Sequence, residues 1–488
     1  MATVTHEQSV IDGVHKGLYI GGEWREGSGG ESFAVEDPST GEPLCEVADG
    51  TPEDGTAALD AAVEMREEWA VHPPRERGEI LHRAFEEVTE RADELALLMT
   101  LEMGKPISDS KSEVNYAAEY LRWFSEQPVR IDGRYTVSPN GEQRTIVMKQ
   151  PVGPCYMVTP WNFPLAMGAR KIAPAVAAGC TMVMKPSRLT PLSMLALADI
   201  LERAGLPAGV LNVVTSSSSS EISEPIVSDP RLRKLTFTGS TPIGRKLMEQ
   251  ASENLLRVSM ELGGNAPFII FEDADLDAAI DGALTAKMRN IGEACTAANR
   301  FHVAEPVAER FTEALAERMG SMKVARGTEE GAEVGPLIDE DQRSKVAGLV
   351  DDALGKGATA VVGGQSVEGA GYFYEPTVLG DVPYSADLRH EEIFGPVAPV
   401  FPVGSEEEAI ATANDTEYGL VAYVYTRDLE RALRVTEGLE FGMVGLNQGR
   451  VSNAAAPFGG VKHSGFGREG GYEGIDEYLE TKYVSVGL

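Results

Sequence analysis

The feature that most constrains the fold is an alternation of short apolar segments with longer stretches of helical character between Lys149 and Gly264. The short segments predict buried strands, and the longer stretches, which stop at Gly179 and Gly205, predict helices. The expected strands are residues 155–158, 181–184, 210–214 and 234–237. Strands that alternate with helices predict a parallel, doubly wound sheet, because each connection returns to the sheet through a helix.

Ligands of a doubly wound sheet bind beyond the carboxyl ends of its strands. The segments that directly follow the expected strands are residues 159–162, 185–188, 239–240 and 261–264. We therefore look for chemistry first in these segments.

The remaining sequence predicts further units. A chain of 488 residues is too long for one compact core, so two or more domains are expected. A second α/β block extends from about residue 265 to 445, and the tail is rich in glycine and then strand-like. Residues 127–149 resemble a hairpin-like excursion, and the serine run 216–220 predicts a loop.

Local patterns predict two helix boundaries. Apolar residues recur at helical spacing from residue 78 to 103, which predicts one helix that Gly104 and Pro106 terminate. Thr190 followed by Pro191 predicts an N-cap and a first helical residue.

The formal net charge of −33 excludes several classes of partner. Such a field repels phosphate, so neither nucleic acid nor an anionic membrane is expected as a partner. An acidic surface poor in lysine is typical of a protein adapted to concentrated salt, where repulsion is screened. No apolar run is long enough for a membrane span and no secretory signal is visible, so a cytoplasmic protein is expected.

The cysteines and histidines give no support to a metal site. The four cysteines form no disulfide framework and no zinc spacing, and the seven histidines form no ligand pair, so no metal is expected.

Three residues have side chains suited to catalysis. Cys295 lies among small and polar neighbours, where a reactive thiol is favoured, although a lone cysteine is more often structural. Glu261 follows a strand and precedes a glycine pair, which suits a general base but also an ordinary exposed glutamate. Asn162 carries an amide that suits an oxyanion, although asparagine is common before turns. The usual GxGxxG fingerprint is absent, so pattern alone indicates only a large soluble α/β enzyme.

At these residues the chain resembles the aldehyde dehydrogenase superfamily, over nearly its whole length from Tyr19. The ordered motifs that carry the resemblance are residues 160–164, 184–187, 237–241, 261–264, the segment around Cys295, 391–396 and 457–465. Their order makes the assignment specific, since each motif alone is weak.

The resemblance implies that the Cys295 thiolate attacks the aldehyde and that the Asn162 amide and the Cys295 N–H hold the oxyanion. It implies that hydride passes to a nicotinamide cofactor, NAD or NADP, and that Glu261 activates the water that hydrolyses the thioester. The residues expected around the cofactor are Thr159, Pro160, Trp161, Lys185, Ser187, Arg188, Gly239, Ser240, Leu262, Gly263, Glu392 and Phe394.

Within the superfamily the chain looks most like the succinate-semialdehyde dehydrogenase branch, on its C-terminal motifs and on Arg289-Asn290. In that branch two arginines and a serine hold the distal carboxylate, and the matching positions are Arg170, Arg289 and Ser452. An arginine fork fits a carboxylate bidentately. The alternative for Arg289 is a salt bridge on a helix face.

Several residues depart from the family pattern. Glu293 stands where glutamine is usual, so we expect an added negative charge that raises the pKa of the thiol. Ala297 replaces a second cysteine of some relatives, so no disulfide switch is expected, and residues 216–220 replace a glycine-containing loop. Arg188 replaces a glutamate that binds the adenosine 2′-hydroxyl in NAD-preferring relatives, which favours NADP or dual use.

Other functions remain open at this point. Glutarate semialdehyde, an aromatic aldehyde or a sugar-derived aldehyde are alternative substrates. A CoA-acylating relative usually lacks the base corresponding to Glu261, and a non-catalytic relative tends to lose the nucleophile, but both residues are present.

The resemblance also implies a domain plan and a homodimer or homotetramer. Residues 1–126 and 149–264 are expected to form the dinucleotide-binding domain, and 265–445 the catalytic domain. Residues 127–148 and 472–488 are expected to form an oligomerisation arm, while 446–471 return to the cofactor domain.

Overall fold

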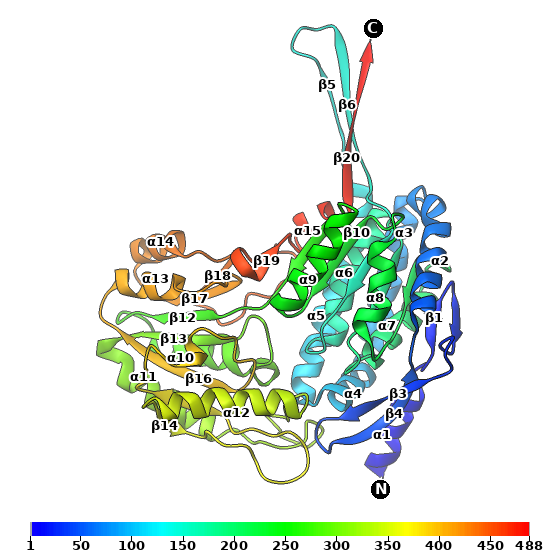
Figure 1. Ribbon diagram of the computed structural model, residues 1–488. Helices are drawn as coiled ribbons and strands as arrows, with labels where there is room; N and C mark the ends of the chain where they lie inside the picture. The colour runs from blue at the N-terminus through cyan, green and yellow to red at the C-terminus, as the bar shows by residue number, and fades with distance from the viewer. Residues whose placement is uncertain (1, 488) are drawn as a thin grey trace.

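The computed structural model describes residues 2–487, with side chains described from residue 6 onward. Two α/β units lie side by side, and a narrow arm of strands projects from one of them (Figure 1). We call them the first unit, built on an eight-stranded sheet, and the second unit, built on a seven-stranded sheet. This architecture confirms the predicted α/β class with parallel sheets.

The eight-stranded sheet of the first unit has the order β19-β11-β10-β7-β8-β9-β1-β2. Its strands are β1 (Leu18–Ile20), β2 (Glu23–Arg25), β7 (Cys155–Val158), β8 (Met182–Lys185), β9 (Leu211–Val213), β10 (Lys234–Thr238), β11 (Arg257–Glu261) and β19 (Gly465–Phe466). The strands from β7 to β11 pair in parallel, with Val158 opposite Lys185 and Thr238 opposite Glu261. Their carboxyl ends therefore meet at one edge of the sheet.

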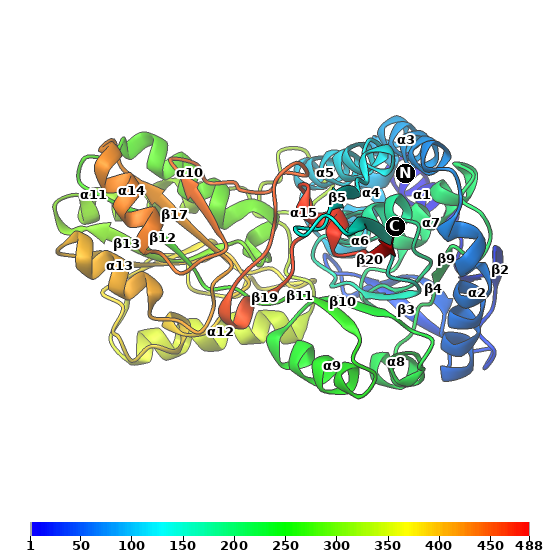
Figure 2. The same ribbon diagram turned by 90° about the horizontal axis from the view of Figure 1, so that it is seen from above.

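Helices cover both faces of this sheet, and Figure 2 shows them on opposite sides of the strands. One face is covered by α2 (Pro52–Ala70), α8 (Ser219–Ser228) and α9 (Thr241–Glu253). The other is covered by α3 (Pro74–Glu90), α4 (Ala92–Met103), α5 (Ile107–Ser125), α6 (Pro164–Ala178) and α7 (Leu192–Arg203). All fifteen residues of α6 are buried, so this helix lies inside the unit.

The seven-stranded sheet of the second unit has the order β14-β15-β16-β13-β12-β17-β18. Its strands are β12 (Ala266–Ile270), β13 (Ala298–Ala304), β14 (Thr359–Val362), β15 (Thr377–Gly380), β16 (Val397–Val403), β17 (Val421–Tyr425) and β18 (Met443–Leu446). One face packs against α10 (Leu276–Met288), α11 (Glu305–Gly320) and α12 (Glu340–Gly355), and the other against α13 (Glu406–Asn414) and α14 (Leu429–Gly438).

The arm is a three-stranded antiparallel sheet of β5 (Arg134–Val137), β6 (Gln143–Pro151) and β20 (Leu479–Gly487). The C-terminal strand β20 runs beside β6 from the base of the arm outward, away from both units (Figure 1). The smaller elements are α1 (Ala2–Asp12), β3 (Ser32–Asp37), β4 (Glu42–Ala48) and α15 (Glu473–Asp476). Within the part of the chain that the structure describes, no helix combines the length and apolarity that a membrane span needs.

Three local expectations are wrong. The predicted single helix over residues 78–103 is two helices that meet at Arg91, whose guanidinium pairs with Glu87, Glu94 and Asp199. Thr190 does not cap α7, since its hydroxyl donates to the Trp161 carbonyl. The cap is Glu102, which accepts from the N–H groups of Leu192 and Ser193. The serine run is not wholly a loop, because α8 begins at Ser219.

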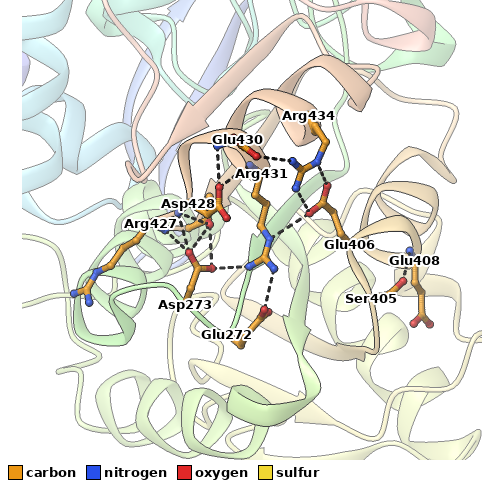
Figure 3. A network of polar contacts seen from close by, with 11 residues as sticks. Glu272, Asp273, Ser405, Glu406, Glu408, Arg427, Asp428, Glu430, Arg431 and Arg434 are labelled. Atoms are coloured by element: carbon orange, nitrogen blue, oxygen red, sulfur yellow. Dashed lines mark hydrogen bonds and ion pairs between the residues drawn. The ribbon is translucent and has the colours of Figure 1, made fainter.

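A network of ion pairs joins α13, α14 and the end of β12 around Arg431 (Figure 3). The guanidinium of Arg431 lies 2.9 Å from Glu272, 2.7 Å from Asp273 and 3.2 Å from Glu406. It also stacks over the ring of Phe271 at 4.7 Å. One cation thus holds three carboxylates together in an otherwise strongly acidic chain.

Replacing Arg431 with methionine is expected to lower the free energy of unfolding by about 2–3 kcal/mol, because three carboxylates lose their shared cation. Added KCl should reduce this deficit by screening the repulsion. The matched control is Arg427→Met, because Arg427 is 67% exposed and pairs with Asp275 alone. Urea unfolding at low and high KCl measures both effects, and equal small losses in the two variants would contradict the expectation.

Candidate active site

A cleft of about 750 Å³ opens at the edge of the first sheet where the carboxyl ends of its strands meet. It is lined from both units, since β11 delivers Glu261 and the second unit delivers Cys295, Gln342, Lys345, Glu392 and Phe394. Every residue that the resemblance assigns to catalysis or to the cofactor lines this cleft: Cys295, Glu261, Asn162, Thr159, Pro160, Trp161, Lys185, Ser187, Arg188, Gly239, Ser240, Leu262, Gly263, Glu392 and Phe394. The fold thus brings together side chains that are as far apart in the sequence as Thr159 and Phe394.

The loop that carries Cys295 has a strained backbone. Asn290 and Ile291 have φ values of 56° and 61°, a left-handed conformation that is costly for a β-branched residue. Hydrogen bonds hold it in place, since the Asn290 N–H donates to Asp109 at 2.8 Å and its side-chain amide donates to the Glu293 carbonyl at 2.9 Å. A Cβ on Gly264 would lie 2.4 Å from the Cys295 carbonyl oxygen, so this glycine permits the loop to reach the end of β11.

The Cys295 thiol is half-buried and carries its proton in the free enzyme. Burial raises its pKa to about 12, and the nearby carboxyls of Glu392 and Glu261 act in the same direction. The cations Arg170 and Arg289 oppose this rise. Forming the thiolate therefore costs free energy, and the positive charges of Arg170 and Arg289 reduce this cost.

Asn162 is fixed by a buried ion pair. The Lys105 ammonium donates to the Asn162 carbonyl at 2.8 Å and pairs with the Glu113 carboxylate, both side chains being inaccessible to solvent. The other oxygen of Glu113 accepts from the N–H groups of Leu165 and Ala166, at the positive N-terminus of α6. The side-chain amide of Asn162 donates to the Glu293 carbonyl at 2.9 Å, which orients it toward the loop of Cys295.

Glu261 is buried at the end of β11, and among the described residues neither carboxyl oxygen has a hydrogen-bond partner. Burial raises its pKa well above the usual value and the nearby Glu469 adds to the rise, while Arg170 and Lys171 oppose it. Burial favours a higher pKa for Glu469 as well. Its ion pairs with Arg170 and Lys171 outweigh this effect and lower its pKa to about 2. An unsatisfied, protonatable carboxyl that faces the cleft suits proton transfer with water or substrate.

The expected negative charge of Glu293 is opposed by its position in the fold. Its side chain is fully buried, with one oxygen accepting from the Ile338 N–H at 3.1 Å. Burial raises its pKa well above the usual value, which favours the neutral form. The neutral form of glutamate is close in shape and charge to the glutamine that is usual at this position.

The cofactor side of the cleft offers groups that fit a dinucleotide. Lys185 is buried. Its pKa is lowered to about 8, mainly by burial and further by the nearby positive charge of Arg188. Glu392 accepts from the Gly264 N–H at 3.0 Å. Ser240 caps α9 without a side-chain hydrogen bond, so the helix N–H groups are free to bind a pyrophosphate. The Phe394 ring meets Trp161 edge to face, with 5.3 Å between centroids.

On the substrate side the structure brings Arg289 and Ser452 together. The Arg289 guanidinium donates to the Ser452 hydroxyl at 3.3 Å and to Thr296 at 3.4 Å. Arg170 does not line the small cavity that these two residues share. It is paired with Glu469 and stacked on Phe458 at 4.1 Å, so its charge acts on Cys295 and Glu261.

Sequence reasoning missed several residues of the site. Glu469 and Lys171 lie within or beside matched motifs, so closer attention to charged residues there would have found them. Gln342 donates to the Phe394 carbonyl at 2.6 Å, and Lys105 and Glu113 hold Asn162. No sequence signal marks these three, because their partners lie far away along the chain.

The raised pKa of Cys295 predicts slow alkylation of the free enzyme. Because only the thiolate reacts, the rate of modification by iodoacetamide should rise about tenfold per pH unit from pH 7 to 10 without a plateau. Arg170→Met should lower the rate at every pH, since a cation that favours the thiolate is lost. Mass spectrometry of the Cys295 peptide measures this, and a plateau near pH 8 would contradict the account.

Comparison with known proteins identifies the family. The model of the aldehyde dehydrogenase family matches residues 24–484. A succinate-semialdehyde dehydrogenase of Paenarthrobacter nicotinovorans is 59% identical over 91% of this chain and 98% of its own. The NADP⁺-dependent succinate-semialdehyde dehydrogenase GabD of Escherichia coli K12 is 49% identical, and a glutarate-semialdehyde dehydrogenase of Pseudomonas putida 48%, each covering 96% of this chain and 97% of its own.

Solved structures agree with these matches. The succinate-semialdehyde dehydrogenase of Burkholderia pseudomallei superposes with a TM-score of 0.96 at 48% identity, covering 98% of this chain and 99% of its own. Betaine aldehyde dehydrogenase of Staphylococcus aureus in complex with NAD⁺ gives 0.95 at 34% identity, covering 98% and 96%. The family predicted from the ordered motifs is confirmed, and the chain belongs to the aldehyde dehydrogenase family.

Proposed function

We propose that this enzyme oxidises succinate semialdehyde to succinate with NADP or NAD. The observation that carries the proposal is the pair of Arg289 and Ser452, which lines a small cavity together with Ala294 and Thr296, the two neighbours of Cys295. Among the described residues, no carboxylate lies within ion-pair distance of Arg289, so its fork is available for an anionic substrate. The similarity to succinate-semialdehyde dehydrogenases supports the same substrate.

The residues of the cleft supply the steps of an acyl transfer. The Cys295 thiol gives up its proton to water in the cleft, its sulfur bonds to the aldehyde carbon, and the Asn162 amide and the Cys295 N–H donate to the resulting oxyanion. A nicotinamide held in the cleft would supply the acceptor for the hydride of this carbon, whose loss leaves a thioester on Cys295. Glu261 then takes a proton from water as the water attacks the thioester, which releases the carboxylate and restores the thiol.

A kinetic panel without CoA tests the proposed substrate. Succinate semialdehyde should have a kcat/KM about 100-fold above that of butanal, which has the same carbon number but no carboxylate for the arginine fork. A preference for butanal, for an aromatic aldehyde or for a sugar-derived aldehyde would overturn the proposal. Glutarate semialdehyde is the second candidate, supported by the related glutarate-semialdehyde dehydrogenases.

NADP is the favoured cofactor because of the cations at one end of the cleft. Arg188 is exposed there and lines the cleft with Lys246 and the serines 217–220 at the start of α8. A 2′-phosphate would find two cations and several hydroxyl donors in this region. Arg188 also lies close enough to Lys185 to affect its pKa, which places it near the expected ribose contacts.

Arg188→Glu should shift the ratio of kcat/KM for NADP over NAD about 100-fold toward NAD, because a cation that faces the phosphate becomes an anion. Arg66→Glu serves as the control for net charge, since Arg66 lies on the outer helix α2. A wild-type enzyme that uses NAD at least as well as NADP, with no change in Arg188→Glu, would refute the preference.

The arm supports assembly into a homodimer or homotetramer. Apolar side chains stand exposed on β5 and β20, with Tyr135 63%, Val137 51% and Tyr483 59% exposed. A narrow three-stranded ribbon is marginal in isolation, so a second copy of the chain is the expected cover. Sedimentation as a monomer at micromolar concentration would contradict this.

The acidic surface supports adaptation to salt. With a net charge of −33, repulsion between carboxylates is expected to weaken the fold at low ionic strength. Thermal melts with and without KCl measure this, and a melting temperature that does not change would contradict it.

A further inference from the structure

The active site is bordered by a second cavity that shares no lining residue with the cofactor cleft. This open cavity of about 930 Å³ lies between α5 and the segment 442–458, and α5 faces the second unit (Figure 2). It meets the small cavity of Arg289 at three residues that line both, Arg450, Val451 and Ser452. Arg450 therefore lies between the open cavity and Arg289.

Arg450 carries a charge that the described residues leave uncompensated. No carboxylate among them lies within 4 Å of its guanidinium. By contrast, arginines elsewhere in this acidic chain, such as those of the network around Arg431, pair with carboxylates. It is half-buried, and burial together with the nearby Arg289 lowers its pKa. Two cations thus stand close together where the two cavities meet.

The nearest acidic group does not neutralise this pair. Asp109 is close enough to feel both Arg289 and Arg450, but its carboxyl accepts the Asn290 N–H at 2.8 Å. Burial also raises the pKa of Asp109. The remaining neighbour that acts on Arg450 is the Tyr116 hydroxyl. A bound anion would neutralise the positive charges of Arg289 and Arg450.

We propose that Arg450 determines specificity as the second arginine for the distal carboxylate of the substrate, acting with Arg289 and Ser452. This takes the place that the resemblance gives to Arg170, which is already bound to Glu469. The inference rests on the proposed function, since it concerns the same aldehyde acids. Because Arg450 borders the open cavity and Arg289 does not, Arg450 should matter more for glutarate semialdehyde, whose carboxylate reaches one methylene farther.

The test compares Arg450→Met and Arg450→Lys with the wild-type enzyme on three aldehydes. The aldehydes are butanal, succinate semialdehyde and glutarate semialdehyde, each at saturating cofactor. The control is Arg318→Met, which removes the same charge from a pair with Asp281 on the outer helices α10 and α11. Arg450→Lys keeps the charge without the bidentate fork, and it serves as the second variant if methionine impairs folding.

Arg450→Met should raise KM about tenfold for succinate semialdehyde and more for glutarate semialdehyde, with kcat little changed, because binding of the remote carboxylate is lost. Butanal should be oxidised as by the wild type, and Arg450→Lys should lie between the two. An equal loss for butanal and the aldehyde acids, or no loss for any of them, would overturn the inference. If the wild type itself prefers butanal, the proposed function fails and the inference fails with it; if only the Arg450 variants disagree, the proposed function stands.

Discussion

Replacing Cys295 with alanine will lower kcat for aldehyde-dependent reduction of NAD or NADP by at least about 10⁴-fold, because no other group can form the covalent adduct. Cys295 alone of the four cysteines lines the cleft. Cys155 and Cys180 are buried away from it in the first unit. A stopped assay with succinate semialdehyde and either cofactor measures the loss.

The matched control is Cys45→Ala. Cys45 is a half-buried free cysteine in β4, and its pKa is raised to about 11 mainly by burial. It thus resembles Cys295 in exposure and acidity but lies outside the cleft. We expect Cys45→Ala to keep full activity, while Cys295→Ala is inactive. Residual activity above a few percent in Cys295→Ala would contradict the assignment of Cys295 as the nucleophile.

The second large effect concerns Glu261 and separates the two halves of the reaction. In Glu261→Gln the steady-state kcat should fall about 10³-fold, because the water that hydrolyses the thioester loses its base. Cofactor reduction in the first turnover should persist, since the Cys295 sulfur and the Asn162 amide remain. Stopped-flow absorbance should therefore show a burst of one reduced cofactor per active site, followed by very slow turnover.

Glu293→Gln is the matched control for this prediction. Both glutamates are buried and burial raises the pKa of each, so each change replaces a buried glutamate with an amide of the same shape. Only Glu261 faces the cleft, whereas Glu293 accepts a hydrogen bond from the Ile338 N–H. Glu293→Gln should turn over like the wild type. Loss of the burst in Glu261→Gln would mean that this residue acts before hydride transfer.

The alternation of strand and helix predicted the first sheet and the edge at which the cleft opens, because periodicity is a local property that tertiary contacts seldom override. The break at Arg91 was not predictable in this way. The apolar pattern continues from α3 into α4, and the ion pair that helps to fix the junction reaches Asp199 on α7. The cap of α7 is likewise non-local, since Glu102 lies 90 residues before Leu192.

The residues of the site were found through their motifs, but their protonation states were not. Glu293 was expected to add a charge, and burial raises its pKa and so opposes that charge. Arg170 matched a substrate position, but Glu469, 299 residues later in the chain, is bound to it. Burial and long-range pairing depend on the assembled fold, and a linear sequence carries no direct record of either.

The most direct test of the central claim is mass spectrometry of Glu261→Gln quenched in acid after a single turnover with succinate semialdehyde and NADP. The account predicts a succinyl group on the peptide that contains Cys295, removed by hydroxylamine as a thioester should be. Reduced cofactor without any acyl group on this peptide, or with the group on another residue, would contradict it.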